Sequence, residues 1–401
     1  MARVLAVRQR VGVTRDPLLR VVRWSSVALC VLVAWTESAH AEPSATNREP
    51  PRDGTKVEEP REPAALSTPT TSDRAVASIL VIVPGLVLHG AGSHALGKRA
   101  TARRLLELEL LGLVLGGLGA GLLFASGSAR DFEGPGALVA LAGAGLFTLS
   151  FTGDLFSVLT PPGGLGRDPG WTPTFESELG YRHVFDPRFD YESFVVTGLT
   201  GRLGRFRLAP SLWSSANDAH QLGRAELAYR LHGPLPGSRT PSGSFVDVAV
   251  AFSGQRFGFE DFDVVTGEAE LEGRWDWGDY DAGLAGAFVD FGVGAATQRH
   301  RFDAAPDEEL RRTFLLASFG FGLYLGDQTP HGGFVRAYYD HRHDGPVGGA
   351  LAFGIGRDPL GFLGLEALYY FAERWGARLD ARWGSAFLVG ASGVFRYGGD
   401  E

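Results

Sequence analysis

The sequence predicts a mainly β protein, in which an antiparallel, up-and-down transmembrane β-barrel of about twelve strands follows a small α-helical hairpin region. Three observations support this fold class. From residue 171 to the C-terminus, apolar and polar residues alternate with a period of two, which places the two sets on opposite faces of a strand. Before that region, three apolar segments have the length of helices. The chain also contains 56 glycines, many of them on the polar faces of the predicted strands.

The N-terminus has the layout of a secretory signal peptide. The only cysteine, Cys30, lies in the apolar stretch VALCVLVAW, with arginines before it and Ala39-His40-Ala41 after it. We therefore expect a signal peptide over residues 1–41 with cleavage after Ala41, the alternative being an uncleaved signal anchor. The mature chain would then contain no cysteine, which excludes disulfides and thiolate metal sites.

Residues 42–73 are rich in Pro, Glu, Thr and Ser and predict a disordered linker. Residues 74–160 then contain the three apolar segments, and Pro84 is expected to break or kink the first of them. The second and third segments carry small residues four apart, which lets two helix backbones approach closely. The sequence therefore predicts a helical hairpin, with its turn at SARDFEGPG because Gly134, Pro135 and Gly136 are strong helix breakers.

Residues 171–398 form the predicted barrel. Alternating runs recur throughout this region, among them FESELGYR, RAELAYRL, VTGEAELEGRWDW, TFLLASFGFGLYLG, FVRAYYDH and GALAFGIG. We count about twelve or thirteen strands joined mostly by short Gly-, Pro- and Asp-containing connections. The uncertainty lies in residues 280–302, which suit one long strand or two shorter ones, and no segment after Gly170 has the pattern of a helix.

The run RWGARLDARW shows why a membrane barrel is favoured over a soluble one. Its apolar face is long and has Trp375 and Trp383 near its ends, whereas its polar face carries Arg378, Asp380 and Arg382. At ~3.3 Å per residue and a tilt near ~40°, the two tryptophans lie roughly 20 Å apart along the membrane normal, close to the ~25 Å apolar band of such barrels. We therefore expect the Trp face to meet lipid and the charged face to line the interior.

With a signal peptide, no mature cysteine and repeated amphipathic segments of about ten residues with aromatic ends, the chain resembles bacterial outer-membrane β-barrel proteins. The resemblance covers Trp171 to Tyr397 and concerns the architecture. It implies the outer membrane as location, lipid as surroundings and the barrel-assembly machinery as a partner. Such barrels usually have an even number of strands and end on an aromatic residue, whereas here GGDE follows Tyr397.

The predicted interior carries both signs of charge, so opposite charges should pair across a narrow lumen and obstruct flow. This favours a narrow channel for a small polar solute, or an envelope structural protein without catalysis, over a wide porin. The net charge of −8 and the lack of a basic stripe argue against nucleic acid. The lumen-facing candidates are Glu176, Glu178, Arg224, Glu226, Arg230, Glu268, Glu270, Glu272, Arg274, Arg378, Asp380 and Arg382.

Two histidine-containing stretches are weaker candidates for a site. In YYDHRHDG, His341 and His343 share one strand face and suit a metal or a general base, as the resemblance to outer membrane phospholipase A would imply, but the serine and asparagine of that enzyme are replaced by Arg342 and His343. His89 and His94 are five residues apart among glycines, which favours local turn and capping contacts over a metal site. We therefore expect no catalytic residue, metal or cofactor.

Two alternatives remain open at this stage. One is a lipid-acting barrel enzyme that uses His341 or His343. The other is an inner-membrane hairpin that carries a soluble periplasmic β domain as a binding module, because LLGLVLGGLGAGLLFASG is about long enough to span a bilayer. For the barrel interpretation, we expect the hairpin to pack against or inside the barrel.

Overall fold

The computed structural model describes residues 71–125, 130–161, 164–166, 172–186, 193–217, 219–237, 242–257, 262–302, 309–326, 331–342 and 361–398. The predicted signal peptide and most of the predicted linker lie outside these residues, as does the predicted strand GALAFGIG (349–356). Residues 71–73, which the sequence assigned to the linker, begin the first helix, α2.

In the described part of the chain, four helices precede the strands: α2 (Thr71–Ile82), α3 (Ala91–Ala95), α4 (Arg99–Ala125) and α5 (Arg130–Leu159). The first predicted segment is broken close to Pro84, because α2 ends at Ile82 and a series of turns leads to α3. Both α4 and the Pro135–Leu159 part of α5 are long and apolar enough to cross a membrane, with mean hydropathies of 2.0 and 1.6.

The antiparallel helices α4 and α5 approach closely through small residues. A Cβ atom on Gly119 would lie 2.2 Å from the Ala140 nitrogen, and one on Gly143 would lie 2.2 Å from the Gly116 nitrogen. By contrast, Gly117 and Gly121 face open space, with no atom within 4 Å of their ideal Cβ positions. Only part of the small-residue pattern therefore serves the contact between these two helices.

The predicted hairpin turn is longer than the one in the structure. The sequence placed it across residues 128–136, whereas α5 begins at Arg130 and contains Pro135. Pro135 is the sixth residue of α5, beyond the four positions whose N–H groups have no helical partner, so it removes one backbone hydrogen bond from a helix that continues past it.

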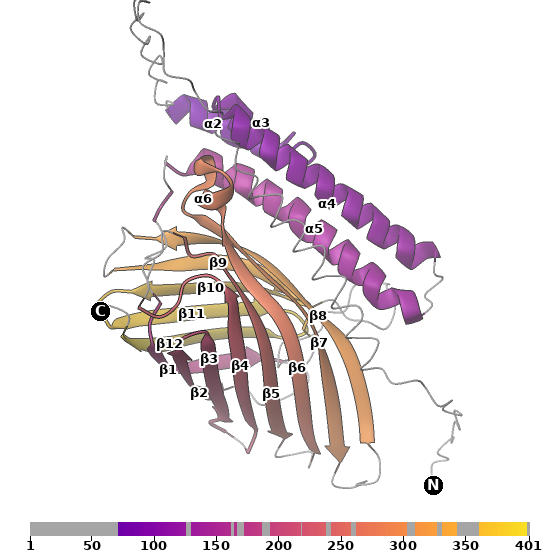
Figure 1. Ribbon diagram of the computed structural model, residues 1–401, viewed down its shortest axis with the longest axis vertical. Helices are drawn as coiled ribbons and strands as arrows, with labels where there is room; N and C mark the ends of the chain where they lie inside the picture. The colour runs from indigo at the N-terminus through magenta and orange to yellow at the C-terminus, as the bar shows by residue number, and fades with distance from the viewer. Residues whose placement is uncertain are drawn as a thin grey trace, which may run out of the picture. The chain divides into compact units, whose positions relative to one another are not determined.

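Twelve strands form one closed antiparallel barrel, in which each strand pairs with its neighbours in sequence and β1 pairs with β12 (Figure 1). The closing register runs from Phe175 opposite Tyr397 to Phe185 opposite Phe387. The strands are β1 (Phe175–Phe185), β2 (Ser193–Leu203), β3 (Phe206–Ser215), β4 (Gln221–His232), β5 (Phe245–Phe257), β6 (Phe262–Asp276), β7 (Ala287–Phe302), β8 (Glu309–Leu325), β9 (Gly332–Asp340), β10 (Phe362–Tyr370), β11 (Trp375–Trp383) and β12 (Phe387–Tyr397).

The region around residues 280–302 forms a single strand, β7, which accounts for the even strand number. Before it stand two short helical elements that the sequence did not predict, α6 (Trp277–Tyr280) and η1 (Ala282–Leu284). The side chains of Asp276 and Asp281 cap them by accepting hydrogen bonds from the amides of Gly278 and Gly283. Elements of three or four residues are too short to show a helical period, so local capping creates them.

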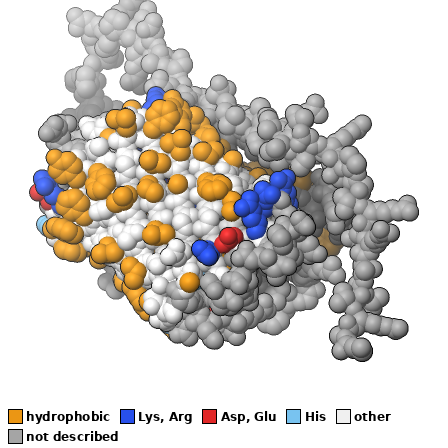
Figure 2. Space-filling model, turned by 90° about the horizontal axis from the view of Figure 1, so that it is seen from below, with side chains coloured by type: hydrophobic (Ala, Val, Ile, Leu, Met, Phe, Trp, Pro, Cys, Tyr) orange, Lys and Arg blue, Asp and Glu red, His pale blue; other side chains and the backbone are white. Residues whose placement is uncertain are grey.

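The outer wall of the barrel is apolar. On β11, Trp375, Leu379 and Trp383 are 54%, 58% and 67% exposed, whereas the alternate residues Gly376, Arg378, Asp380 and Arg382 are turned inward. Figure 2 shows hydrophobic side chains spread over one face, with charged ones near the margin of the described surface. A soluble barrel would bury these side chains and expose the charges.

The hairpin packs against the outside of this wall at β7 and β8. Leu149 and Phe156 of α5 share a buried cluster with Trp277 of α6, against which Phe321 of β8 also packs. A Cβ atom on Gly153 would lie 2.2 Å from the Trp277 ring. The Thr101 hydroxyl also donates a 2.8 Å hydrogen bond to Asp281. The hairpin therefore lies beside the barrel rather than inside it.

Candidate functional site

The lumen of the barrel holds a network of ion pairs, which we call the ion-pair layer. Several of its members join strands that are not neighbours in the sheet. Arg378 on β11 lies 2.5 Å from Glu178 on β1, and Arg207 on β3 pairs with Glu272 on β6. Side chains from strands two or three apart can meet only across the interior, so these charges face the lumen.

One part of the ion-pair layer is centred on Arg378. Its guanidinium lies 3.4 Å from Glu176 and 3.4 Å from Glu366, in addition to its contact with Glu178. The Tyr370 hydroxyl and the Ser392 hydroxyl donate hydrogen bonds to Glu176 and Glu178 at 3.1 and 2.7 Å. Each of these carboxylates is therefore held by more than one donor.

A second part joins β3 and β4 to β6 and to the residues after β9. Arg224 pairs with Glu268 and lies 3.0 Å from Glu226. Arg342 reaches Glu268 at 2.6 Å and Glu270 at 2.9 Å. Because Arg342 follows β9 and both carboxylates stand on β6, this bridge spans a wide arc of the barrel wall.

A third part extends the Arg378 part of the layer to β6. Asp290 on β7 accepts hydrogen bonds from Arg274 at 2.8 Å and from Arg336 at 2.6 Å. Arg336 on β9 also lies 2.7 Å from Glu366 on β10, which in turn contacts Arg378. A continuous chain of opposite charges therefore runs from β6 to β1.

The ion-pair layer is not dry. The side chains of Arg207, Arg224 and Arg336 are 24%, 26% and 28% exposed although they point into the barrel. Exposure of this size leaves room for water beside the guanidinium groups. Guanidinium and carboxylate groups that retain water are desolvated less than fully buried ion pairs, so they can re-pair with a charged or polar solute at a lower cost.

A second layer of the lumen is apolar. It consists of Val184, Phe194, Val196, Trp213, Phe362, Ala386 and Leu388, and Leu222, Phe257 and Tyr338 pack against it. Val184 and Leu388 are fully buried, and Phe194 is 1% exposed. These residues come from β1 to β5, from β9 and β10, and from the start of β12. We call this set the apolar layer.

Charges inside the barrel and apolar side chains outside it decide the class of protein. The chain is a transmembrane β-barrel. It resembles bacterial outer-membrane β-barrel proteins, as the alternation in RWGARLDARW predicted, and the soluble alternative is wrong because the apolar wall faces outward. The attached hairpin covers part of that wall.

Comparisons with known proteins give only distant structural likenesses. No family model and no curated protein matches the sequence. Among solved structures, the chain is similar to a KdgM porin in complex with disordered oligogalacturonate (5% identity, 55% of this chain and 99% of that one, TM-score 0.34). It is also similar to the outer membrane protein Omp33 of Acinetobacter baumannii (10% identity, 57% of this chain and 100% of that one, TM-score 0.29). A third similar structure is the translocator domain of the autotransporter NalP from Neisseria meningitidis (12% identity, 56% of this chain and 89% of that one, TM-score 0.30). At such low identities and TM-scores, these likenesses say nothing about the function of this chain.

The structure brings every lumen-facing candidate into an ion pair. Arg230 pairs with Asp247, and Asp380 lies 3.2 Å from Arg182 and 3.5 Å from Arg382. Sequence reasoning missed Asp247, Asp290, Arg336 and Arg342 as members of the layer. Asp247 and Asp290 stand in strands whose two faces are both largely apolar, so the period of two did not single them out. Arg342 was missed because it follows the end of β9.

The two histidine-containing stretches show no metal site. Nδ1 of His341 lies 2.8 Å from the Tyr339 hydroxyl, which in turn accepts a hydrogen bond from the Gly361 amide, and His343 lies outside the described residues. Within the described ranges, no group of three His, Cys, Asp or Glu side chains is placed to hold a metal.

His89 belongs to a buried polar cluster between the helices. Its amide donates to Glu109 at 2.8 Å, and its Nδ1 lies 2.5 Å from the Ser150 hydroxyl. Asp154 accepts hydrogen bonds from the amides of Gly90, Gly92 and Ser93. Burial lowers the pKa of His89, and the nearby Glu109 and Asp154 offset this only in part. His94 is exposed on α3.

Proposed function

We propose that the protein is an outer-membrane barrel whose lumen acts as a narrow passage for a small polar solute. The observation that carries this proposal is the ion-pair layer: a two-signed and partly solvent-accessible lining inside a closed barrel. Such a lining offers hydrogen-bond donors and acceptors in place of a solute's water, as the walls of selective pores do.

The same layer argues against a wide diffusion pore. Arg342 and Arg207 form ion pairs with carboxylates across the lumen. Free flow of large solutes would therefore require several of these ion pairs to separate at once. A small solute needs only local exchange of one partner. No catalytic step is needed for this function, and none of the described residues is assigned one.

A second candidate function follows from the apolar layer. Its largest side chains are almost completely buried, which is the packing of a protein core rather than of an open pore. Apolar constrictions also gate channels by excluding water. The apolar layer therefore supports either a gate in the passage or a closed barrel with a structural role in the envelope.

The proposed location and partners are inferred from the apolar outer wall of the barrel. Its exposed apolar side chains require lipid around the barrel, and a closed barrel with a charged interior is suited to the outer membrane, where barrel-assembly machinery would insert it. The packing of α5 on β8 supports one bilayer for the hairpin and the wall. This supports a single location instead of an inner-membrane anchor with a soluble domain.

The location is tested by membrane fractionation of the expressing cell. We expect the protein in the outer-membrane fraction, with an electrophoretic mobility that changes on boiling, as folded barrels show. Recovery in the inner-membrane fraction without such a change would overturn the proposed location.

The passage is tested by conductance of the purified full chain in planar bilayers. We expect small unit currents in the parent chain. The currents should rise in the double variant Arg342→Ala/Glu270→Ala, because it removes both side chains of one ion pair that crosses the lumen. The matched control, Arg103→Ala/Glu107→Ala, removes an ion pair on the exposed face of α4 and should leave the currents unchanged. Absence of current in all three proteins would overturn the channel and favour the closed structural barrel.

A further inference from the structure

We propose that one mouth of the lumen carries a binding site for a small oxyanion, a carboxylate or a phosphate group, formed by Arg202, Arg205 and Arg230. The inference rests on the proposed function for its role in transport, since it names the class of solute. The binding site itself is inferred from the geometry of the pocket and does not depend on transport.

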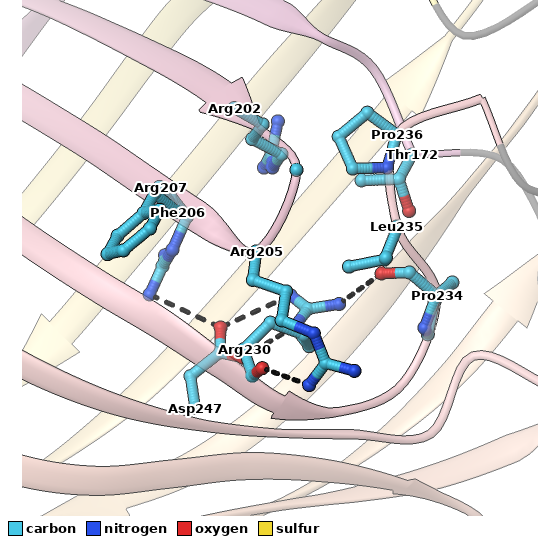
Figure 3. A pocket seen from close by; sticks show the side chains of 11 residues that line it. Thr172, Arg202, Arg205, Phe206, Arg207, Arg230, Pro234, Leu235, Pro236 and Asp247 are labelled. Carbon is cyan, nitrogen blue, oxygen red and sulfur yellow. Dashed lines mark hydrogen bonds and ion pairs between the residues drawn. The ribbon is translucent and has the colours of Figure 1, made fainter.

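The site is a small pocket at the end of the barrel where β2 turns into β3 and where the loop after β4 begins (Figure 3). Arginines from β2, β3, β4 and the β2–β3 turn meet there beside one aspartate. The lining residues are Thr172, Arg202, Gly204, Arg205, Phe206, Arg207, Arg230, Pro234, Leu235, Pro236 and Asp247. Four positive side chains and one negative side chain thus surround the pocket.

The positive charge of the pocket is only partly neutralised. Arg207 and Arg230 share Asp247, and Arg207 also contacts Glu226 and Glu272 from the ion-pair layer. Among the described residues, no carboxylate forms an ion pair with Arg202 or Arg205. This separates them from the arginines of the ion-pair layer, each of which has a carboxylate partner.

Both arginines keep most of their donors. Arg202 Nη1 donates to the Pro173 carbonyl at 3.0 Å, and Arg205 Nη1 donates to the carbonyls of Arg230 and Leu231 at 3.2 Å. A guanidinium group has five N–H donors in a planar fork, so further donors remain on each side chain. That fork matches the two oxygens of a carboxylate or phosphate.

The register adds a reason for an anion at this place. Arg202 and Arg207 stand directly opposite each other on β2 and β3, and both lie on the lumen face. Like charges in such a pair repel each other. A bound oxyanion would relieve this repulsion, because it provides negative charge between the two guanidinium groups.

The pocket is held in shape before any ligand arrives. Gly204 adopts a φ of 56° in the tight turn that positions Arg205, a conformation in which glycine is favoured. Arg230 is fixed by Asp247 and by a 2.8 Å hydrogen bond to the Pro234 carbonyl. Pro234, Leu235 and Pro236 form an apolar wall on one side of the pocket.

Arg207 links the pocket to the ion-pair layer, because it contacts both Asp247 in the pocket and Glu272 in the layer. An oxyanion bound at the mouth could exchange onto Arg207 and then onto the next arginine inward. The pocket would therefore act as the entry site for an anionic solute.

The test is isothermal titration of the detergent-folded full chain with inorganic phosphate and, separately, with citrate at constant ionic strength. We expect saturable binding of at least one of them, weakened about tenfold or more in Arg202→Gln/Arg205→Gln, since two charge-assisted contacts are removed. The control Arg374→Gln removes an arginine from the β10–β11 turn outside the pocket and should bind like the parent chain.

The outcomes separate this inference from the channel. No binding of either anion, or equal binding by the double variant, would overturn the oxyanion site even if the barrel conducts. Binding that is lost in the double variant supports the site, and a barrel that binds but passes no current in bilayers would remove the channel while keeping the site.

Discussion

The guanidinium of Arg182 lies over the indole ring of Trp213, with 4.3 Å between the guanidinium carbon and the ring centroid. Arg182 Nε also donates to Asp380 at 3.2 Å. One side chain thus joins the apolar layer, through a cation–π contact, to the ion-pair layer. The two layers are therefore connected through Arg182, and a substitution in one layer should alter the packing of the other.

Arg182→Leu should destabilise the barrel by roughly 3 kcal/mol, the lower end of the cost of breaking a buried ion pair, because Asp380 keeps Arg382 at 3.5 Å. Urea unfolding of the detergent-folded chain measures this. Arg103→Leu, which removes an exposed ion pair on α4, should cost less than about 1 kcal/mol. An equal loss of unfolding free energy in the two variants would show that the contacts of Arg182 stabilise the barrel no more than an exposed ion pair does.

Gly153→Val should weaken the attachment of the hairpin to the barrel, because a Cβ atom there would lie 2.2 Å from the Trp277 ring. We expect a loss of about 1–3 kcal/mol in the free energy of unfolding, as overpacking usually causes. Gly117→Val is the matched control, since nothing lies within 4 Å of that Cβ position. If Gly117→Val proved as harmful as Gly153→Val, the packing of α5 on the wall would be wrong.

Glu268→Gln should shift the ion selectivity of the lumen toward anions. The substitution takes a carboxylate from Arg224 and Arg342 and so makes the ion-pair layer more positive. Reversal potentials under a salt gradient measure the change, which should shrink at high ionic strength because salt screens the charges. Arg378→Gln should shift the potential in the opposite direction. A shift of the same sign in both variants would contradict a lumen pathway.

The stability of the chain should fall on acidification through His89. Because burial lowers its pKa, the unfolded state binds a proton first, so stability is lost as the pH falls below the usual histidine value of about 6.5. His89→Gln should reduce this loss between neutral and mildly acidic pH. His94→Gln, in the exposed position on α3, should keep it. A pH dependence unchanged by His89→Gln would remove His89 as its source.

The sequence was sufficient for the barrel and for much of its lining. Strict alternation in β11 placed Arg378 and Leu379 on opposite faces, and the tryptophans near the ends of the apolar face predicted that the Leu379 face meets lipid. It was not sufficient for the partners. The bridge from Arg342 to Glu268 joins residues 74 positions apart, and only barrel closure and register bring them together.

The oxyanion pocket and the short elements before β7 escaped prediction for a related reason. Arg205 begins the alternating run RFRLAPSLW, which predicts its face but not its neighbours, and its meeting with Arg202 depends on the β2–β3 register. Pro135 is a helix breaker by residue type, but α5 begins at Arg130 and continues past it. Local signals therefore failed where the contacts come from residues distant in sequence or where the helix tolerates a breaker.

The hairpin on β7 and β8 gives the barrel a front and a back in the plane of the membrane. A bare barrel offers neighbours much the same wall on every side, whereas here one sector is occupied by the chain's own helices. Any assembly of several copies through bare barrel walls must use the remaining sectors, and neighbouring proteins that approach from the covered side meet α4 and α5 first. The protein thus has a built-in lateral orientation.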